Sequence, residues 1–174
     1  MLIPEPQDGE YGEYRIELQG VANGGEYTLA SSYIDEENLA NNQESEIHSE
    51  ILPNTTDSFI LDFNKDHPDQ TNIQSEVDFD KLIELTNILY NAGEIKKESV
   101  KKLLILRFKL LGRQYDKMIN SKNNKQKQLL KIALKLELKL LNKTLNLYLS
   151  KKWITEKAKS ILSTNINFLV EKLK

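Results

Sequence analysis

The sequence predicts a mainly α protein, a small antiparallel bundle of about four helices preceded by an acidic arm with a β-hairpin. Two observations lead to this prediction. From residue 78 onward, apolar residues recur at spacings of three and four, as on the buried face of a helix. Before that point the chain has few apolar residues and many acidic ones. We therefore expect an acidic arm over residues 1–77 and a basic helical bundle over residues 78–174.

Charge separates the same two parts. Residues 1–80 contain 19 Asp or Glu and two basic residues, a formal charge of −17. Residues 81–174 contain 22 Lys or Arg and seven acidic residues, a formal charge of +15, so the net charge of −2 hides the division. Such asymmetry predicts that the two parts attract each other or bind oppositely charged partners.

The arm is expected to contain a β-hairpin over residues 14–34. Residues 14–18 alternate between apolar and polar side chains, residues 27–34 do so more weakly, and a glycine-rich segment separates them. Residues 35–77 read as a linker, because they are poor in apolar groups. An alternative for their best apolar island is a short motif that adds a strand to a partner, made of Phe59, Leu61 and Phe63.

Four helices are expected in the basic part. Asp78 or Asp80 can cap the first, and Gly93 ends it. The second is expected over residues 97–120, the third over about 125–150, and the fourth begins near Thr155. The third is so rich in Leu and Ile that we expect it to be buried over more than half its circumference, as the central element of the bundle.

A ridge of lysines is the main candidate interaction surface. The third helix carries a lysine at every fourth position, which makes a row that winds slowly around it. The row could bind nucleic-acid phosphates or an acidic protein surface. It could also be a solvated surface, since the composition of the chain is rich in Lys and Asn, with 21 Lys, three Arg and 16 Asn. The residues of the ridge are Lys127, Lys131, Lys135, Lys139 and Lys143.

Trp153, between the third and fourth helices, is a candidate contact residue. It could stack on a partner, or it could fasten two helix ends together.

No catalytic, cofactor or metal site is expected. The chain has no cysteine, and its two histidines lie in the linker-like stretch without a paired ligand. Residues 62–66 open like a calcium loop but lack the Gly and Glu that complete one. The start resembles no secretory signal, and lysines interrupt every leucine cluster, so we expect a soluble cytoplasmic chain without a membrane span.

The function expected from these observations is non-catalytic. The chain would be an interaction or assembly subunit in which the acidic arm and the basic bundle contact each other or oppositely charged protein partners. The alternative is a nucleic-acid-binding protein whose Lys-rich helical face is shielded by the acidic arm.

Overall fold

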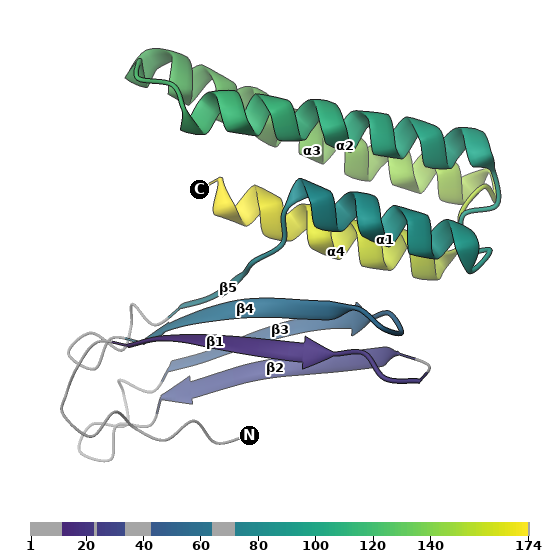
Figure 1. Cartoon of the computed structure of the whole chain (residues 1–174), viewed down its shortest axis with the longest axis horizontal. Helices are drawn as coiled ribbons and strands as arrows, with labels where there is room; N and C mark the ends of the chain where they lie inside the picture. The colour runs from purple at the N-terminus through teal and green to yellow at the C-terminus, as the bar shows by residue number, and fades with distance from the viewer. Residues whose placement is uncertain (1–11, 23, 34–42, 64–71, 174) are drawn as a thin grey trace. The chain divides into compact units, whose positions relative to one another are not determined.

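The computed structural model describes residues 12–22, 24–33, 43–63 and 72–173. In these ranges five strands are followed by four helices (Figure 1). The chain is therefore mixed α/β, and the prediction of a mainly α protein whose arm holds only a hairpin is wrong. The chain divides into two compact units, Met1–Glu76 and Val77–Lys174, which we call the sheet unit and the helical unit.

The strands of the sheet unit pair in a nested order. The outer pair is β1 with β4, and the inner pair is β2 with β3, both antiparallel. The short β5 adds to the free side of β4, which gives one sheet in the order β1-β4-β5 and a second of β2-β3. The strand bounds are β1 Gly12–Gln19, β2 Gly25–Tyr33, β3 Gln43–Ile51, β4 Thr56–Phe63 and β5 Asn72–Ser75.

The predicted hairpin over residues 14–34 is wrong in its pairing. Both of its strands form, as β1 and β2, but each pairs with a strand from the stretch that had been predicted to be a linker. In β3, QESEIHSEI, only two of nine residues are apolar. An apolar pattern this sparse gives little sign of a strand, although cross-strand pairs can still stabilise one.

The nested pairs form one two-stranded ribbon that folds back on itself at a corner. At this corner Gly20 joins the segment that follows β1 to the segment that precedes β4. Its N–H donates to the Thr55 carbonyl at 2.9 Å, and its own carbonyl accepts from Asn54 N–H at 2.9 Å. The sequence between β1 and β2 is one residue longer than that between β3 and β4, and an unequal number of residues on two paired chain segments bends a ribbon.

Contacts between the two sheets show that the ribbon is folded. Tyr27 of β2 meets Phe59 of β4 edge to face, with ring centroids 6.2 Å apart. The Tyr27 hydroxyl donates to Asp57 Oδ2 at 2.9 Å. Phe59 is completely buried, and the other buried apolar residues in the described part of this unit are Ile16, Ile51, Leu52 and Ile73.

The helical unit contains four helices joined by short connections. Each helix packs on the next, and α1 also packs on α4, which closes an antiparallel bundle (Figure 1). Three helices begin at side-chain caps, from Asp78, Asn123 and Thr155, and α1 is followed by Gly93 at a φ of +77°. The bounds are α1 Phe79–Asn91, α2 Glu98–Ile119, α3 Asn124–Ser150 and α4 Glu156–Lys172.

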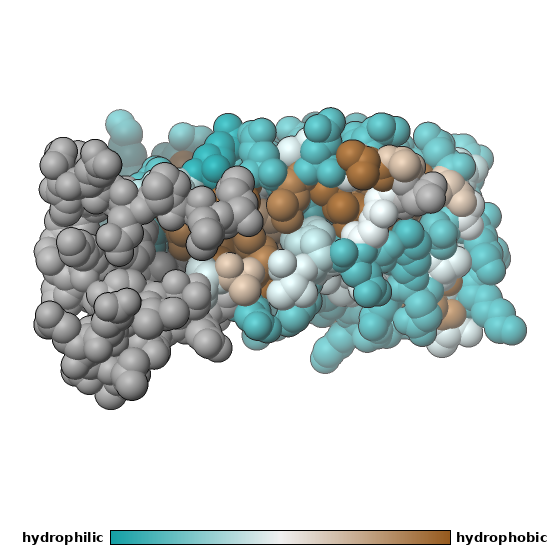
Figure 2. Space-filling view, turned by 90° about the horizontal axis from the view of Figure 1, so that it is seen from below, coloured by the Kyte–Doolittle hydropathy of each residue, from teal (hydrophilic) through white to brown (hydrophobic). Residues whose placement is uncertain are grey.

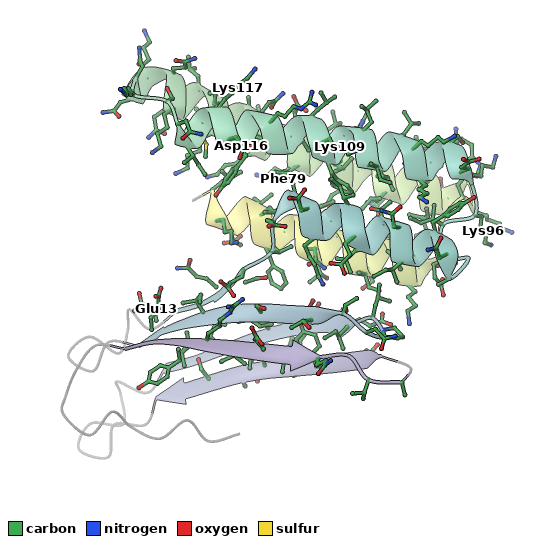
Figure 3. The ribbon with its side chains drawn as sticks, viewed as in Figure 1. Glu13, Phe79, Lys96, Lys109, Asp116 and Lys117 are labelled. Carbon is green, nitrogen blue, oxygen red and sulfur yellow. The ribbon has the colours of Figure 1, made fainter. Side chains whose placement is uncertain are left out.

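One side of each helix supplies the bundle core. Leu82, Leu104, Phe108, Leu138 and Leu162 are at most 1 % exposed. At the beginning of α1, Phe79 lies against α2 (Figure 3) and contacts the Tyr115 ring at a centroid distance of 5.9 Å.

Candidate interaction surface of the helical unit

The lysine ridge lies on α3, and it does not form a single face. Positions four apart on an α-helix are offset by roughly 40°, so the five lysines from Lys127 to Lys143 turn through about 160°. Their environments differ accordingly: Lys131 and Lys135 are half-buried, while the other three are exposed. A row that turns this far presents only part of its charge to any one flat partner.

Exposed leucines and isoleucines on α3 form a narrower stripe than the lysines do. Leu134, Leu138, Leu141, Leu145 and Tyr148 face the core. A second apolar set is 50–63 % exposed and falls within an arc of about 80° on roughly the opposite side of the helix. The expectation that α3 is buried over more than half its circumference is therefore wrong. The exposed set is Leu129, Ile132, Leu136, Leu140 and Leu147.

Helix α2 has a matching stripe. Leu103, Leu106 and Leu110 are 48–54 % exposed at spacings of three and four. The opposite side of α2 faces α1, because a Cβ at Gly112 would lie 3.3 Å from Phe79 Cβ and the Lys101 ammonium lies 4.6 Å from the Tyr90 ring centroid. The three leucines therefore lie on the side of α2 that borders α3.

The two stripes meet on the outer face of the α2–α3 pair. On α3, Asn142 donates a hydrogen bond to Asn167 of α4 at 2.9 Å, so α4 lies on the side of α3 away from the stripe. The helices are antiparallel and joined at residues 120–123, which brings residues equally far from this turn to the same level. Three cross-helix pairs result, and we call them the outer Leu patch: Leu103 with Leu140, Leu106 with Leu136, and Leu110 with Ile132.

The two helices that carry the outer Leu patch have an excess of basic residues. Helices α2 and α3 together contain twelve Lys or Arg and only three acidic residues, Glu98, Asp116 and Glu137. Of these, Glu98 forms an ion pair with Lys102 on its own helix at 2.8 Å. Lys109 and Lys117 project from α2 (Figure 3). The six half-exposed side chains present on the order of 500 Å² of apolar surface, near the upper end for the largest patch of an ordinary monomer.

Trp153 joins two helix ends. Its ring lies 5.8 Å from that of Tyr148 on α3 and is contacted by the ammonium groups of Lys97 and Lys151, at 4.4 and 4.7 Å from the ring centroid. Its carbonyl accepts from Lys96 N–H at 2.9 Å, next to an antiparallel bridge that pairs the α1–α2 and α3–α4 connections. These contacts give the residue a structural use at the end of the bundle where Lys96 lies (Figure 3).

The predicted strand-adding motif lies in β4. This strand pairs with β1 along its whole length and with β5 from Phe59 to Asp62, so these residues have no free edge to offer a partner. The Phe59 side chain is buried and Leu61 is half-buried, while Phe63 is described only through its backbone pairing with Gly12.

Two classes of site find no support in the described parts of the chain. In those residues no three His, Cys, Asp or Glu side chains gather as metal ligands would, and no helix is long and apolar enough to cross a membrane. His48 is exposed, 2.9 Å from Thr28 and 3.1 Å from Glu46, while His67 lies outside the described residues. In Figure 2, hydrophilic side chains cover most of the described part of the face shown, with hydrophobic clusters between them.

Comparisons with known proteins identify no family for this chain. No family model, curated protein or solved structure matches this chain.

Proposed function

We propose that this chain is a non-catalytic interaction subunit whose helical unit binds an acidic protein partner through the outer face of α2 and α3. The outer Leu patch is the observation that carries the proposal. It is apolar, lies on the side away from the bundle core, and belongs to two helices with far more basic than acidic residues. The cytoplasmic location expected from the sequence remains a prediction.

Apolar and charged groups would have different tasks in such an interface. Burial of the leucines would supply most of the affinity, because each is about half exposed in the chain alone. The lysines and arginines of α2 and α3 would speed association and select an acidic partner over a basic or neutral one. An enzyme would instead need convergent polar groups in a pocket.

Nucleic acid is a weaker candidate for the same surface. Phosphate binding needs cations that follow a backbone, and the ridge from Lys127 to Lys143 turns through about 160° of the helix surface. The most prominent exposed feature of α2 and α3 is apolar, and it is aliphatic instead of aromatic. Base stacking on single strands uses aromatic side chains.

A photocrosslinking experiment tests the class of partner. Leu136 is replaced by benzoylphenylalanine in the full chain, expressed in the cells that make this protein. The matched control carries the same group at Ile119, which is also half exposed but lies on another side of α2. The proposal predicts protease-sensitive adducts from position 136 and not from 119, with a partner of acidic surface and with loss of the adduct at high salt. Nuclease-sensitive adducts, or none specific to position 136, would contradict it.

A further inference from the structure

The outer Leu patch is an exposed apolar surface on two adjacent helices, and we infer that it binds an acidic amphipathic helix of the partner protein. This inference rests on the proposed function and specifies the partner element. It follows from the arrangement of the apolar side chains, from the charge of the two helices, and from the position of the aromatic residues.

The apolar side chains are arranged as the complement of a helix. They lie at three levels along the outer face of α2 and α3: Leu103 with Leu140, Leu106 with Leu136, and Leu110 with Ile132. Along α2 these levels are separated by three and four residues, which is the repeat of the apolar stripe on any amphipathic helix. A helix lying along this face could therefore place one apolar residue at each level.

The length of the α3 stripe indicates how long the partner helix is. From Leu129 to Leu147 the exposed stripe extends over 19 residues, a rise of about 27 Å at 1.5 Å per residue. A partner helix of about 18–20 residues would cover it.

The charge of α2 and α3 indicates which kind of partner helix would bind the patch. Helices α2 and α3 carry twelve basic and three acidic residues. Arg113, Lys117 and Lys125 lie toward the α2–α3 turn, and Lys139 and Lys143 lie toward the other end of the patch. A second copy of this face would bring lysines against lysines, which opposes association. A helix with glutamates beside its leucines would bring opposite charges to these two basic helices.

The aromatic residues argue against a lipid surface as the occupant. Surfaces that settle into the membrane interface commonly expose Trp, Tyr or Phe. On α2 and α3 these residues are used inside the bundle: Phe108 is fully buried, Tyr148 is 8 % exposed, and Tyr115 packs on Phe79.

Two synthetic peptides test the inference against the full chain. Both have 20 residues and the same content of Leu, Glu, Gln and Ala. In one the leucines recur at three and four residues, and in the other they are spread around the helix. Binding is measured by fluorescence anisotropy at low and high salt, with peptides shown to be monomeric at the concentration used. Vesicles of neutral lipid containing about one-third anionic lipid form a third arm.

The variants isolate the patch. L136E changes its most exposed side chain, and I119E makes the same change elsewhere on α2. Far-UV circular dichroism and melting temperature confirm that both variants fold as the original chain does. The inference predicts that the amphipathic peptide binds at least tenfold more tightly than the scrambled one. It also predicts that L136E weakens binding at least tenfold, while I119E changes it less than twofold.

Three outcomes would overturn the inference. They are equal binding of both peptides, binding to neither, and stronger binding to the anionic vesicles than to the amphipathic peptide. The first two leave the proposed function standing if position 136 still crosslinks to an acidic protein. The proposed function itself fails only in the crosslinking experiment, so the two failures can be told apart.

Discussion

Substitution of Gly20 by alanine should unfold the ribbon corner of the sheet unit. A Cβ at this position would lie 2.1 Å from the Leu52 carbonyl oxygen and 3.0 Å from its carbonyl carbon, whereas ordinary contact begins at 3.4 Å. The obstructing atoms are backbone, so no side chain can rotate away. The chain segments around Gly20 and Leu52 would have to move apart by more than 1 Å at the corner.

The expected cost follows from two terms. Overpacking against rigid neighbours costs about 1–3 kcal/mol. Separating these two chain segments also strains the hydrogen bonds from Gly20 N–H to the Thr55 carbonyl and from Asn54 N–H to the Gly20 carbonyl, each 2.9 Å long. Each bond contributes about 1 kcal/mol to stability. The sum is about 3–5 kcal/mol, which in a unit of this size corresponds to a fall in melting temperature of roughly 15 °C or more.

Hydrogen exchange measured by mass spectrometry on peptides from β1 and β4 reports the stability of the sheet unit. Fluorescence of Trp153, the single tryptophan, reports the helical unit separately. Gly25 provides the matched control, because a Cβ there would meet nothing within 4 Å. G25A should change the free energy of unfolding by no more than about 1 kcal/mol, and in the stabilising direction. The corner geometry would be refuted if G20A left exchange in β1 and β4 unchanged, or if G25A accelerated it equally.

Three further predictions concern other parts of the chain. Burial and the Asp57 carboxylate raise the pKa of Tyr27 above its usual range, so the sheet unit should lose stability as pH rises above the unfolded-state pKa of about 10. Chemical denaturation followed by near-UV circular dichroism from pH 8 to 11 should show this loss, and Y27F should reduce it. In the helical unit, L138A should lower the free energy of unfolding by about 2–5 kcal/mol and L136A by less than about 0.5 kcal/mol, because Leu138 is 0 % and Leu136 63 % exposed. Denaturant unfolding followed by Trp153 fluorescence measures both losses. Equal losses would contradict the assignment of Leu138 to the core. Lys152 has a φ of +56°, so K152G should stabilise the helical unit by up to about 1 kcal/mol in the same assay, and a loss of stability would show that the Lys152 side chain outweighs its backbone strain.

The helices were predictable because their apolar period is strong and their ends carry recognisable residues. The structure caps α1 at Asp78, one of the two residues expected, and Gly93 follows its end. The strands after residue 42 were not predictable in the same way. In β3 the inward positions hold few apolar residues, and its partner β2 is separated from it by residues 34–42. Local alternation identified β1 and β2 but could not show that each pairs with a later strand.

The candidate surface was only partly predictable. The sequence located basic charge on α3, but it gave no means of dividing the leucines of that helix between core and solvent. That division needs the directions of α2 and α4, which the Gly112–Phe79 approach and the Asn142–Asn167 hydrogen bond supply. The sequence left Trp153 open as a helix-junction residue or a partner contact. Its contacts with Lys97 and Lys151 could not be predicted, because they depend on the bridge between the two connections.

Two apolar stripes on one helix explain why the centre of α3 alternates like a strand. In the segment ALKLELKL, Leu134 and Leu138 face the core, while Leu136 and Leu140 face outward, so leucine occupies every second position. Packing the bundle requires only the first stripe. A Leu- and Lys-rich composition could place further leucines on the helix, but it would distribute them around the whole exposed side. The five exposed residues instead fall within an arc of about 80°, and three of them lie level with exposed leucines of α2. This coincidence between two helices is what favours a binding surface over a consequence of composition.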